Sequence, residues 1–147
     1  MSNKKLVVTA LLLMLSAALF SGCSKKQAVK PEPPDIKISQ QAFKVIDEVK
    51  TGYEKKDDAA IKAVSTGDGY IEVTKTFGDF DTAKLKFVPK WVEITDGAVT
   101  VNIAWEGTWT KGGNTATDNG MAVFELKGTP LKFNRVIKGS PFVYPGK

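Results

Sequence analysis

The residue types that this chain lacks restrict its chemistry more than those it contains. It has no histidine among 147 residues, and its one cysteine is Cys23. A Ser-His-Asp triad, a Cys-His pair and a histidine-ligated metal site are therefore excluded. No glycine-rich phosphate loop follows an expected strand, because the glycine pair at 112–113 falls in a hairpin turn. We expect no metal and no cofactor, and the remaining catalytic option is based on carboxylates.

Arg135 is the only arginine, and it shares a two-residue alternation with Phe133 and Ile137, which we expect to face inward. A buried guanidinium needs a partner. One register of the last hairpin puts Phe133 opposite Glu125 and Arg135 diagonal to it. We expect an ordinary sheet-stabilising pair, and the alternative is an arginine that meets an anionic ligand.

Three tryptophans form a second candidate set, with Glu106 between the last two of them. Trp105 falls on the apolar face of an expected strand, where a large aromatic side chain usually belongs to the core. Trp109 lies near a hairpin end, where half exposure is the alternative to a core position. Exposed aromatic surface with a polar rim often marks a partner site. Core packing is therefore expected for Trp91, Trp105 and Trp109, and a pocket wall or docking patch is the alternative.

The elements that must position these side chains begin with helices. Ser39 is suited to cap a first helix, whose apolar residues recur at helical spacing as far as Tyr53. A second short helix is expected to begin at 57 or 58, since carboxylates favour the positive end of a helix. Gly67 and Gly69 should then break the chain. We expect a third short helix within 69–80, although the β-branched residues there would also suit a strand.

From residue 83 onward the apolar period is two, which predicts strands. Segment 83–88 alternates, 91–94 continues it past Pro89, 98–109 alternates again, and strands at 121–127 and 131–137 follow. Turn sequences at 95–98, 111–114 and 127–131 separate them. The chain therefore predicts an α+β fold, with N-terminal helices packed on a four-stranded antiparallel meander.

The N-terminal segment predicts export. Two lysines precede an uncharged run at 6–20, which is short for a membrane-spanning helix. Two small residues and then Cys23 follow. This pattern resembles the lipobox of bacterial lipoproteins, whose cysteine is lipidated and becomes the first residue of the mature chain, although Phe20 stands where that family prefers leucine. By the same resemblance Ser24 implies the outer membrane, facing the periplasm, and the alternative is ordinary secretion with a free thiol.

We therefore divide the chain into a signal peptide (1–22), a lipidated cysteine with a proline- and lysine-rich tether (23–37) and a folded domain (38–147). The net charge is +5, but six lysines against two acidic residues lie in 1–37. The folded domain is therefore nearly neutral, and its length suits a single hydrophobic core. Lysines of the tether would lie near anionic headgroups, and nucleic-acid binding is not expected.

The element order, the stretch "WVEITDGAVTVNIAWEGTW" and the segment 139–142 after the last strand resemble the NTF2-like superfamily, with its SnoaL-like and ketosteroid-isomerase-like members. The resemblance implies a curved sheet wrapped around helices, a cone with a pocket, and a homodimer through a sheet face. Its enzymes use an aspartate base, helped by a tyrosine or an acid that stabilises the developing oxyanion. The residues of suitable type are Tyr53, Tyr70, Asp79, Asp81, Glu106 and Asp118. None matches a motif position of the family, so no catalytic role is carried over.

Two kinds of function follow from these observations. The first is a membrane-anchored, non-catalytic module that presents its cone or a sheet face to a small ligand or an envelope protein. The second is a small carboxylate-based enzyme that acts in the cone, for which Glu106 is the residue to test first. The missing histidine and the absence of a recognisable acid–base pair favour the first.

Overall fold

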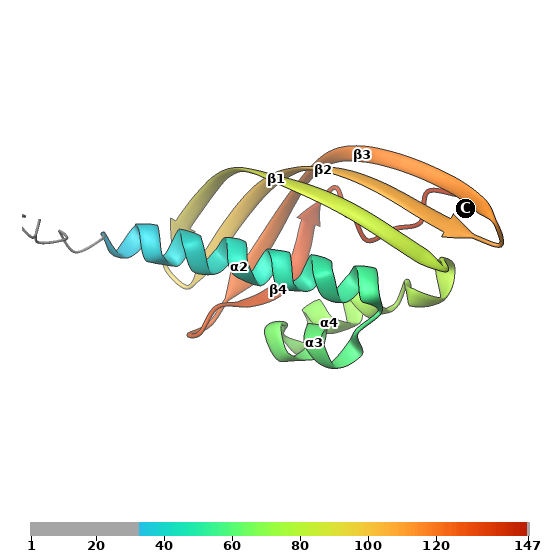
Figure 1. Cartoon of the computed structure of the whole chain (residues 1–147). Helices are drawn as coiled ribbons and strands as arrows, with labels where there is room; N and C mark the ends of the chain where they lie inside the picture. Colours follow the sequence, from blue (N-terminus) through green and yellow to red (C-terminus); the bar gives the residue numbers. More distant parts are fainter. Residues whose placement is uncertain (1–32, 147) are drawn as a thin grey trace, which may run out of the picture. The chain divides into compact units, whose positions relative to one another are not determined.

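Four strands form one antiparallel sheet in the order β1-β2-β3-β4, a simple meander (Figure 1). The computed structural model describes residues 33–146, so the predictions for the signal peptide and Cys23 lie outside the described residues. The strands are β1 Thr82–Thr95, β2 Ala98–Lys111, β3 Asn114–Lys127 and β4 Lys132–Lys138. Helices pack on one face of this curved sheet, which confirms the predicted α+β class.

The hairpin turns lie where the sequence predicts them, but β3 begins earlier than expected. Its first half, 114–120, is polar and shows no alternation, so the sequence suggested a strand only from Met121. Thr115 pairs with Thr110, and every following residue of β3 up to Leu126 has a partner on β2. The tight turn at 111–114 sets this register, and the backbone ladder needs no apolar side chains to continue along it.

Helix α2 spans Pro34–Lys55 and begins five residues before the predicted cap, Ser39. A proline is tolerated in the first helical turn, because the N–H that it lacks has no partner there. Ser39 is instead an interior residue, and its hydroxyl donates a hydrogen bond to the carbonyl oxygen of Asp35 at 2.8 Å. The helix therefore includes the last four residues of the predicted tether.

Two further helices follow, α3 Asp58–Val64 and α4 Gly67–Thr74, and then a single 3-10 turn, η2 Phe77–Asp79. Asp57 caps α3 by accepting the backbone N–H of Ala60 at 3.0 Å, as predicted. The third helix is confirmed, but Gly67 and Gly69 lie within its first turn and do not break it. A Cβ on Gly69 would lie 2.4 Å from the carbonyl oxygen of Phe133. This glycine therefore allows α4 to approach β4 closely.

The sheet has an inner face, which packs on the helices, and an outer face, which points away from them (Figure 1). Inner-face residues of β2 such as Val101 and Ile103 are fully buried between the sheet and α2. From α2, the core receives the apolar residues that the sequence places at helical spacing, including Ile46, Val49 and Tyr53. None of the helices in the described residues is long and apolar enough to span a membrane.

Bulges interrupt the alternation of both edge strands. In β1 the register shifts between Pro89 and Trp91. In β4, Phe133 pairs with Leu126 and Arg135 pairs with Glu125, so Asn134 is an extra residue between two consecutive positions of β3. An extra residue reverses the faces of those that follow it. Arg135 and Ile137 are consequently exposed, and the expectation that they face inward is wrong.

Acidic side chains from the helices bind backbone groups of both edge strands. Glu54 Oε1 on α2 accepts the N–H of Leu85 in β1 at 2.6 Å. Glu72 Oε2 on α4 accepts the N–H of Val136 in β4 at 2.9 Å. Unpaired N–H groups on an edge strand are a template for pairing with another chain. These two carboxylates therefore protect part of each edge.

Candidate functional site

The space between the sheet and the helices is filled with aromatic rings. Tyr53, Phe80 and Phe142 pack together, with 4.9 Å between the ring centroids of Tyr53 and Phe80 and 5.0 Å between those of Tyr53 and Phe142. Phe142 also stacks on Phe124 at 6.0 Å. These side chains are all buried. Phe142 follows β4, so the C-terminal segment supplies one of the rings that fill the interior.

Trp109 is another buried aromatic residue of this interior. Its indole N–H donates a hydrogen bond to the hydroxyl oxygen of Tyr53 at 3.1 Å, and neither side chain is exposed to solvent. Trp109 therefore belongs to the core, as expected for the tryptophans, and the half exposure that its place near a hairpin end suggested does not occur. The inner face accommodates the indole because Gly107 has no side chain, and a Cβ there would lie 2.2 Å from the ring. Trp105, also buried, donates to the carbonyl oxygen of Gly139 at 3.1 Å.

Burial changes the titration of Tyr53 in the interior. Burial raises the pKa of its hydroxyl above the ordinary value of 10.0, hydrogen bonds with Trp109 and Thr76 partly oppose this, and the charge of Asp79 adds to the increase. Tyr53 is therefore neutral at physiological pH. Because its hydroxyl is buried, a substrate could reach it only if the aromatic rings moved apart.

Glu125 and Arg135 form the ion pair that the sequence suggested, but on the outer face. Nε of Arg135 lies 3.0 Å from Glu125 Oε1, and the side-chain amide of Asn134 donates to the same oxygen at 2.7 Å. Lys127 lies 3.2 Å from it. Burial alone would raise the pKa of Glu125, but the hydrogen bonds from Asn134, Lys127 and Arg135 outweigh burial and lower it below 4.5. The arginine therefore already has an anionic partner within the chain.

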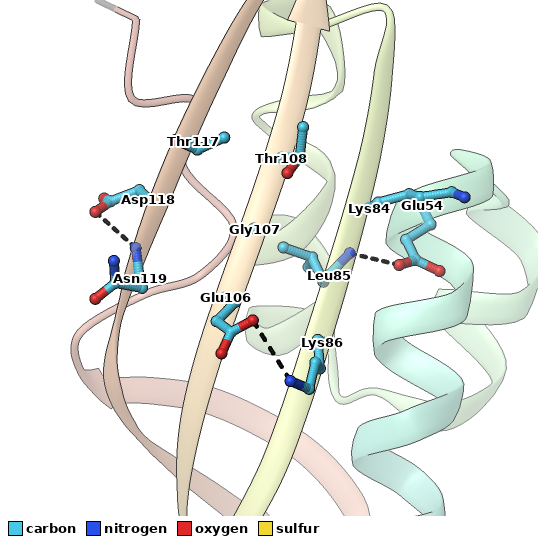
Figure 2. Close-up of a pocket in the computed structure, with 10 residues that line it drawn as sticks. All are labelled: Glu54, Lys84, Leu85, Lys86, Glu106, Gly107, Thr108, Thr117, Asp118 and Asn119. Atoms are coloured by element: carbon cyan, nitrogen blue, oxygen red, sulfur yellow. Dashed lines mark hydrogen bonds and ion pairs between the residues drawn. The ribbon is translucent and has the colours of Figure 1, made fainter.

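Glu106 also lies on the outer face and does not reach the interior. Its carboxylate lies 3.5 Å from the ammonium nitrogen of Lys86, and both side chains are mostly exposed (Figure 2). The two residues border an open, polar hollow of about 570 Å³ formed by β1, β2 and β3 beside Glu54 of α2 (Figure 2). An exposed carboxylate already paired with a lysine has little in common with a buried general base. This position gives no support to acid–base catalysis in the cone.

The outer face carries an apolar patch at its centre. Three of its side chains are large and well exposed, with 55% of Trp91, 47% of Met121 and 40% of Val88 accessible to solvent. Val88 and Met121 lie on either side of Ala104, and Trp91 and Val123 on either side of Asn102. We call this set the outer-face patch: Val88, Trp91, Ala104, Met121 and Val123. Apolar surface exposed together in this way, with a polar rim, is typical of an interaction site.

The structure thus divides the five candidate residues into two groups. Trp91, Glu106 and Arg135 share the outer face, whereas Trp105 and Trp109 belong to the core. Sequence reasoning missed Val88 and Met121, and it favoured a core position for Trp91. Pro89 was the available signal, because a proline in a strand is confined to edges and bulges. Within residues 33–146, no cluster of three or more potential ligands for a metal ion occurs.

The chain matches no family model, and comparison with curated proteins finds no significant match. Solved structures do resemble it. An NTF2-like superfamily protein from Salmonella enterica serovar Typhimurium superposes with a TM-score of 0.61 and 12% identity, over 77% of this chain and 99% of that one. A protein from Novosphingobium aromaticivorans, described as a candidate aromatic ring hydroxylase, also gives 0.61, with 14% identity over 71% of this chain and 89% of that one. At such identities the likeness concerns the fold alone. The described part of the chain therefore has the NTF2-like α+β fold, with three α-helices packed against a curved four-stranded antiparallel sheet.

Proposed function

We propose that this chain is a lipid-anchored protein of the bacterial cell envelope whose folded domain binds another protein through its outer face. The proposed function is neither catalysis nor the binding of a small ligand in the interior. The single observation that carries it is the contrast between the two faces of the sheet. Packed aromatic rings occupy the inner face, while the outer face exposes Trp91 within an apolar patch.

The anchor is supported by the sequence before the folded domain. An uncharged run, two small residues and Cys23 stand in the order of a lipoprotein signal. One acyl chain binds a membrane only reversibly, and two or more hold a protein there durably. Mass spectrometry of the mature N-terminal peptide tests this directly, and we expect Cys23 to carry a diacylglyceryl group. A soluble mature chain with an unmodified thiol would overturn the anchor.

A partner site on the outer face is supported by composition as well as exposure. Tryptophan and methionine are enriched in protein–protein interfaces relative to the rest of the surface. Trp91 and Met121 are here surrounded by charged residues such as Lys86, Glu93 and Arg135, which would form the rim. An apolar centre with a polar rim is the usual anatomy of a specific interface.

Photo-crosslinking of the full chain in cells tests the outer face. A benzophenone amino acid at Thr100 or Thr108, both on this face, should give a discrete adduct with a protein that mass spectrometry can identify. The same amino acid at Glu48, exposed on α2, is the matched control and should give none. If the outer-face positions give no protein adduct, or the control gives the same one, the outer face is not the binding surface.

A further inference from the structure

We infer that the protein bound by the outer face contributes an extended segment, which joins the sheet as a fifth strand beside the first half of β3. This inference rests on the proposed function, since it describes how the partner of that surface is held. Two features of β3 support it. They are the backbone groups that β4 leaves unpaired and the side chains beside them.

The first half of β3 has a neighbouring strand on one side only. Strand β3 has 14 residues whereas β4 has 7, and the pairing of the two ends at Val123 and Lys138. Residues 114–120 pair with β2, and within residues 33–146 no backbone hydrogen bond joins them to another segment. At about 3.4 Å per residue, this free edge is about 20 Å long.

The turn before β3 determines which backbone groups point toward the free edge. Lys111 pairs with Asn114 across a two-residue turn, and both turn glycines have a positive φ, as a type I′ turn requires. Residues that flank such a turn exchange hydrogen bonds, and these bonded pairs recur at every second residue. The N–H and C=O groups of Thr115, Thr117 and Asn119 therefore point away from β2.

Strand β4 does not continue along this edge, because the chain turns out of the sheet at Gly139. This glycine has a φ of +67°, and a Cβ on it would overlap the carbonyl oxygen of Met121. Its own carbonyl oxygen accepts the indole N–H of Trp105 at 3.1 Å. Pro141 follows two residues later and has no N–H to donate. A partner segment can therefore take the place of a longer β4, antiparallel to β3.

The free edge of β3 is less protected than the edges that glutamates of the helices cover. Asp118 Oδ1 accepts the N–H of the next residue, Asn119, at 2.8 Å (Figure 2). Both residues are exposed, so the carboxylate can turn aside when another strand approaches. Within the part of the chain that the structure describes, no side chain accepts the N–H of Thr115 or Thr117. Such groups are a template for strand addition, in which backbone hydrogen bonds give affinity and alternate side chains give specificity.

The side chains along this edge specify the chemistry of the partner segment. Ala116 and Asp118 pair with Trp109 and Gly107, so by alternation they belong to the inner face. Residues directly opposite each other in an antiparallel sheet interact, and opposite charges there favour pairing. We therefore expect a lysine or arginine opposite Asp118. Two residues later we expect a large apolar side chain, because the small Ala116 leaves room beside the buried ring of Trp109.

Two substitutions of Thr117 separate strand addition from binding by side chains alone. Thr117→Pro removes the edge N–H, and a strand tolerates proline where the N–H faces away from its neighbour. Thr117→Val keeps the backbone groups and the β-branched shape, so it is the matched control. The readout is the adduct of the full chain in cells, with a benzophenone amino acid at Thr100. We expect this adduct to fall about tenfold in Thr117→Pro and to stay within about twofold in Thr117→Val.

The partner segment can be located directly from the edge. A benzophenone amino acid at Asn119 should give an adduct with the same protein, and mass spectrometry of the adduct identifies the crosslinked segment. Circular dichroism of each purified variant checks that it folds. An adduct from Asn119 that falls equally in Thr117→Pro and Thr117→Val would overturn backbone pairing.

The charge of Asp118 tests the register without changing the backbone. Asp118→Lys opposes a cation to the expected cation and should lower the Asn119 adduct about tenfold. Replacing the lysine or arginine of the identified segment by glutamate should restore the adduct of this variant. An adduct that Asp118→Lys leaves unchanged would overturn the predicted register.

The two proposals fail in different ways. If Thr100 gives a protein adduct that both Thr117 variants retain, and Asn119 gives none, strand addition is wrong and the outer-face site stands. If Asn119 gives an adduct that only Thr117→Pro loses, while Thr100 and Thr108 give none, the edge binds the partner and the outer face does not. If no position gives a protein adduct, both proposals are wrong.

Discussion

Trp109 and Tyr53 join the sheet to helix α2 through a buried hydrogen bond of 3.1 Å between the indole N–H and the phenol oxygen. The two residues are 56 positions apart in the chain, so neither predicts the other locally. A buried tryptophan or tyrosine usually finds such a partner, because its polar atom would otherwise lose its hydrogen bond to water. Here the phenol oxygen of Tyr53 satisfies the indole N–H, and Tyr53 also has a hydrogen bond with Thr76.

Removing the phenol oxygen should therefore destabilise the fold. In Tyr53→Phe the indole N–H of Trp109 loses its acceptor within the core, which costs about 1–3 kcal/mol. Urea unfolding followed by tryptophan fluorescence measures this. Tyr70→Phe is the matched control, because the Tyr70 hydroxyl donates its hydrogen bond to Asp58 at the exposed surface, so losing it should lower the stability much less. An equal decrease in the free energy of unfolding in both variants would contradict a larger contribution from the buried hydrogen bond.

Stability should fall in alkaline solution through the same residue. Burial raises the pKa of Tyr53 above 10.0 in the folded state. Above pH 10 the unfolded chain therefore releases this proton while the folded chain retains it, which favours unfolding. The contribution is complete below about pH 10 and is lost as the pH rises toward the folded-state pKa. Urea midpoints from pH 8 to 11 should fall more steeply for the native sequence than for Tyr53→Phe, and parallel curves would contradict this.

Phe142 should contribute more to stability than any neighbour in the C-terminal segment. Its ring is buried against Tyr53, Phe124 and Phe133, so Phe142→Ala leaves a cavity and should cost about 3–5 kcal/mol. Val143 is half exposed, and Val143→Ala should change the free energy of unfolding by less than about 0.5 kcal/mol. An apolar cavity of this kind can bind benzene, which should raise the melting temperature of Phe142→Ala only. A similar decrease in the free energy of unfolding in both variants would mean that the ring of Phe142 does not fill the interior.

Two glycines in the first turn of α4 should respond in opposite ways to alanine. A Cβ on Gly69 would meet the carbonyl oxygen of Phe133 at 2.4 Å, so Gly69→Ala should cost about 1–3 kcal/mol. A Cβ on Gly67 meets nothing within 4 Å, and Gly67→Ala should be neutral or should stabilise by up to about 1 kcal/mol. Thermal unfolding of the two variants is a sufficient measurement. A neutral Gly69→Ala would show that α4 and β4 can separate without loss.

The sheet was largely predictable, because turn residues and a two-residue alternation are both local signals. Residues 98–109 alternate cleanly, and Val99, Val101 and Trp105 all face inward as expected. The bulges were not predictable in this way. Their cause is tertiary, since an extra residue at Asn134 lets Phe133 pack inward while Arg135 meets Glu125 outside. A two-residue alternation that is extended through a bulge assigns the side chains directly after it to the wrong face of the sheet.

The candidate site was predictable in residue type but not in place. Trp91 was identified because the chain has only three tryptophans, and Glu106 because it lies between the other two. Trp91 lies on the outer face because of the bulge after Pro89, which a simple alternation does not include. Glu106 lies on the face opposite Trp105, as the alternation of 98–109 predicts. Phe142 fills that interior from a segment without regular structure, where no periodicity indicates what the ring contacts. Gly69 likewise is read as a helix breaker until the approach of Phe133 is known.

The carboxylates that protect the edge strands also have an order in time. Glu54 and Glu72 both precede residue 82, where β1 begins. Both glutamates are therefore synthesised before either of the edge strands that they protect. A newly made chain therefore need not pass through a stage in which both edge strands are unprotected. At such a stage, the edge strands of neighbouring chains could pair with one another. Moving the helices behind the sheet by circular permutation would keep the final contacts but remove this early protection.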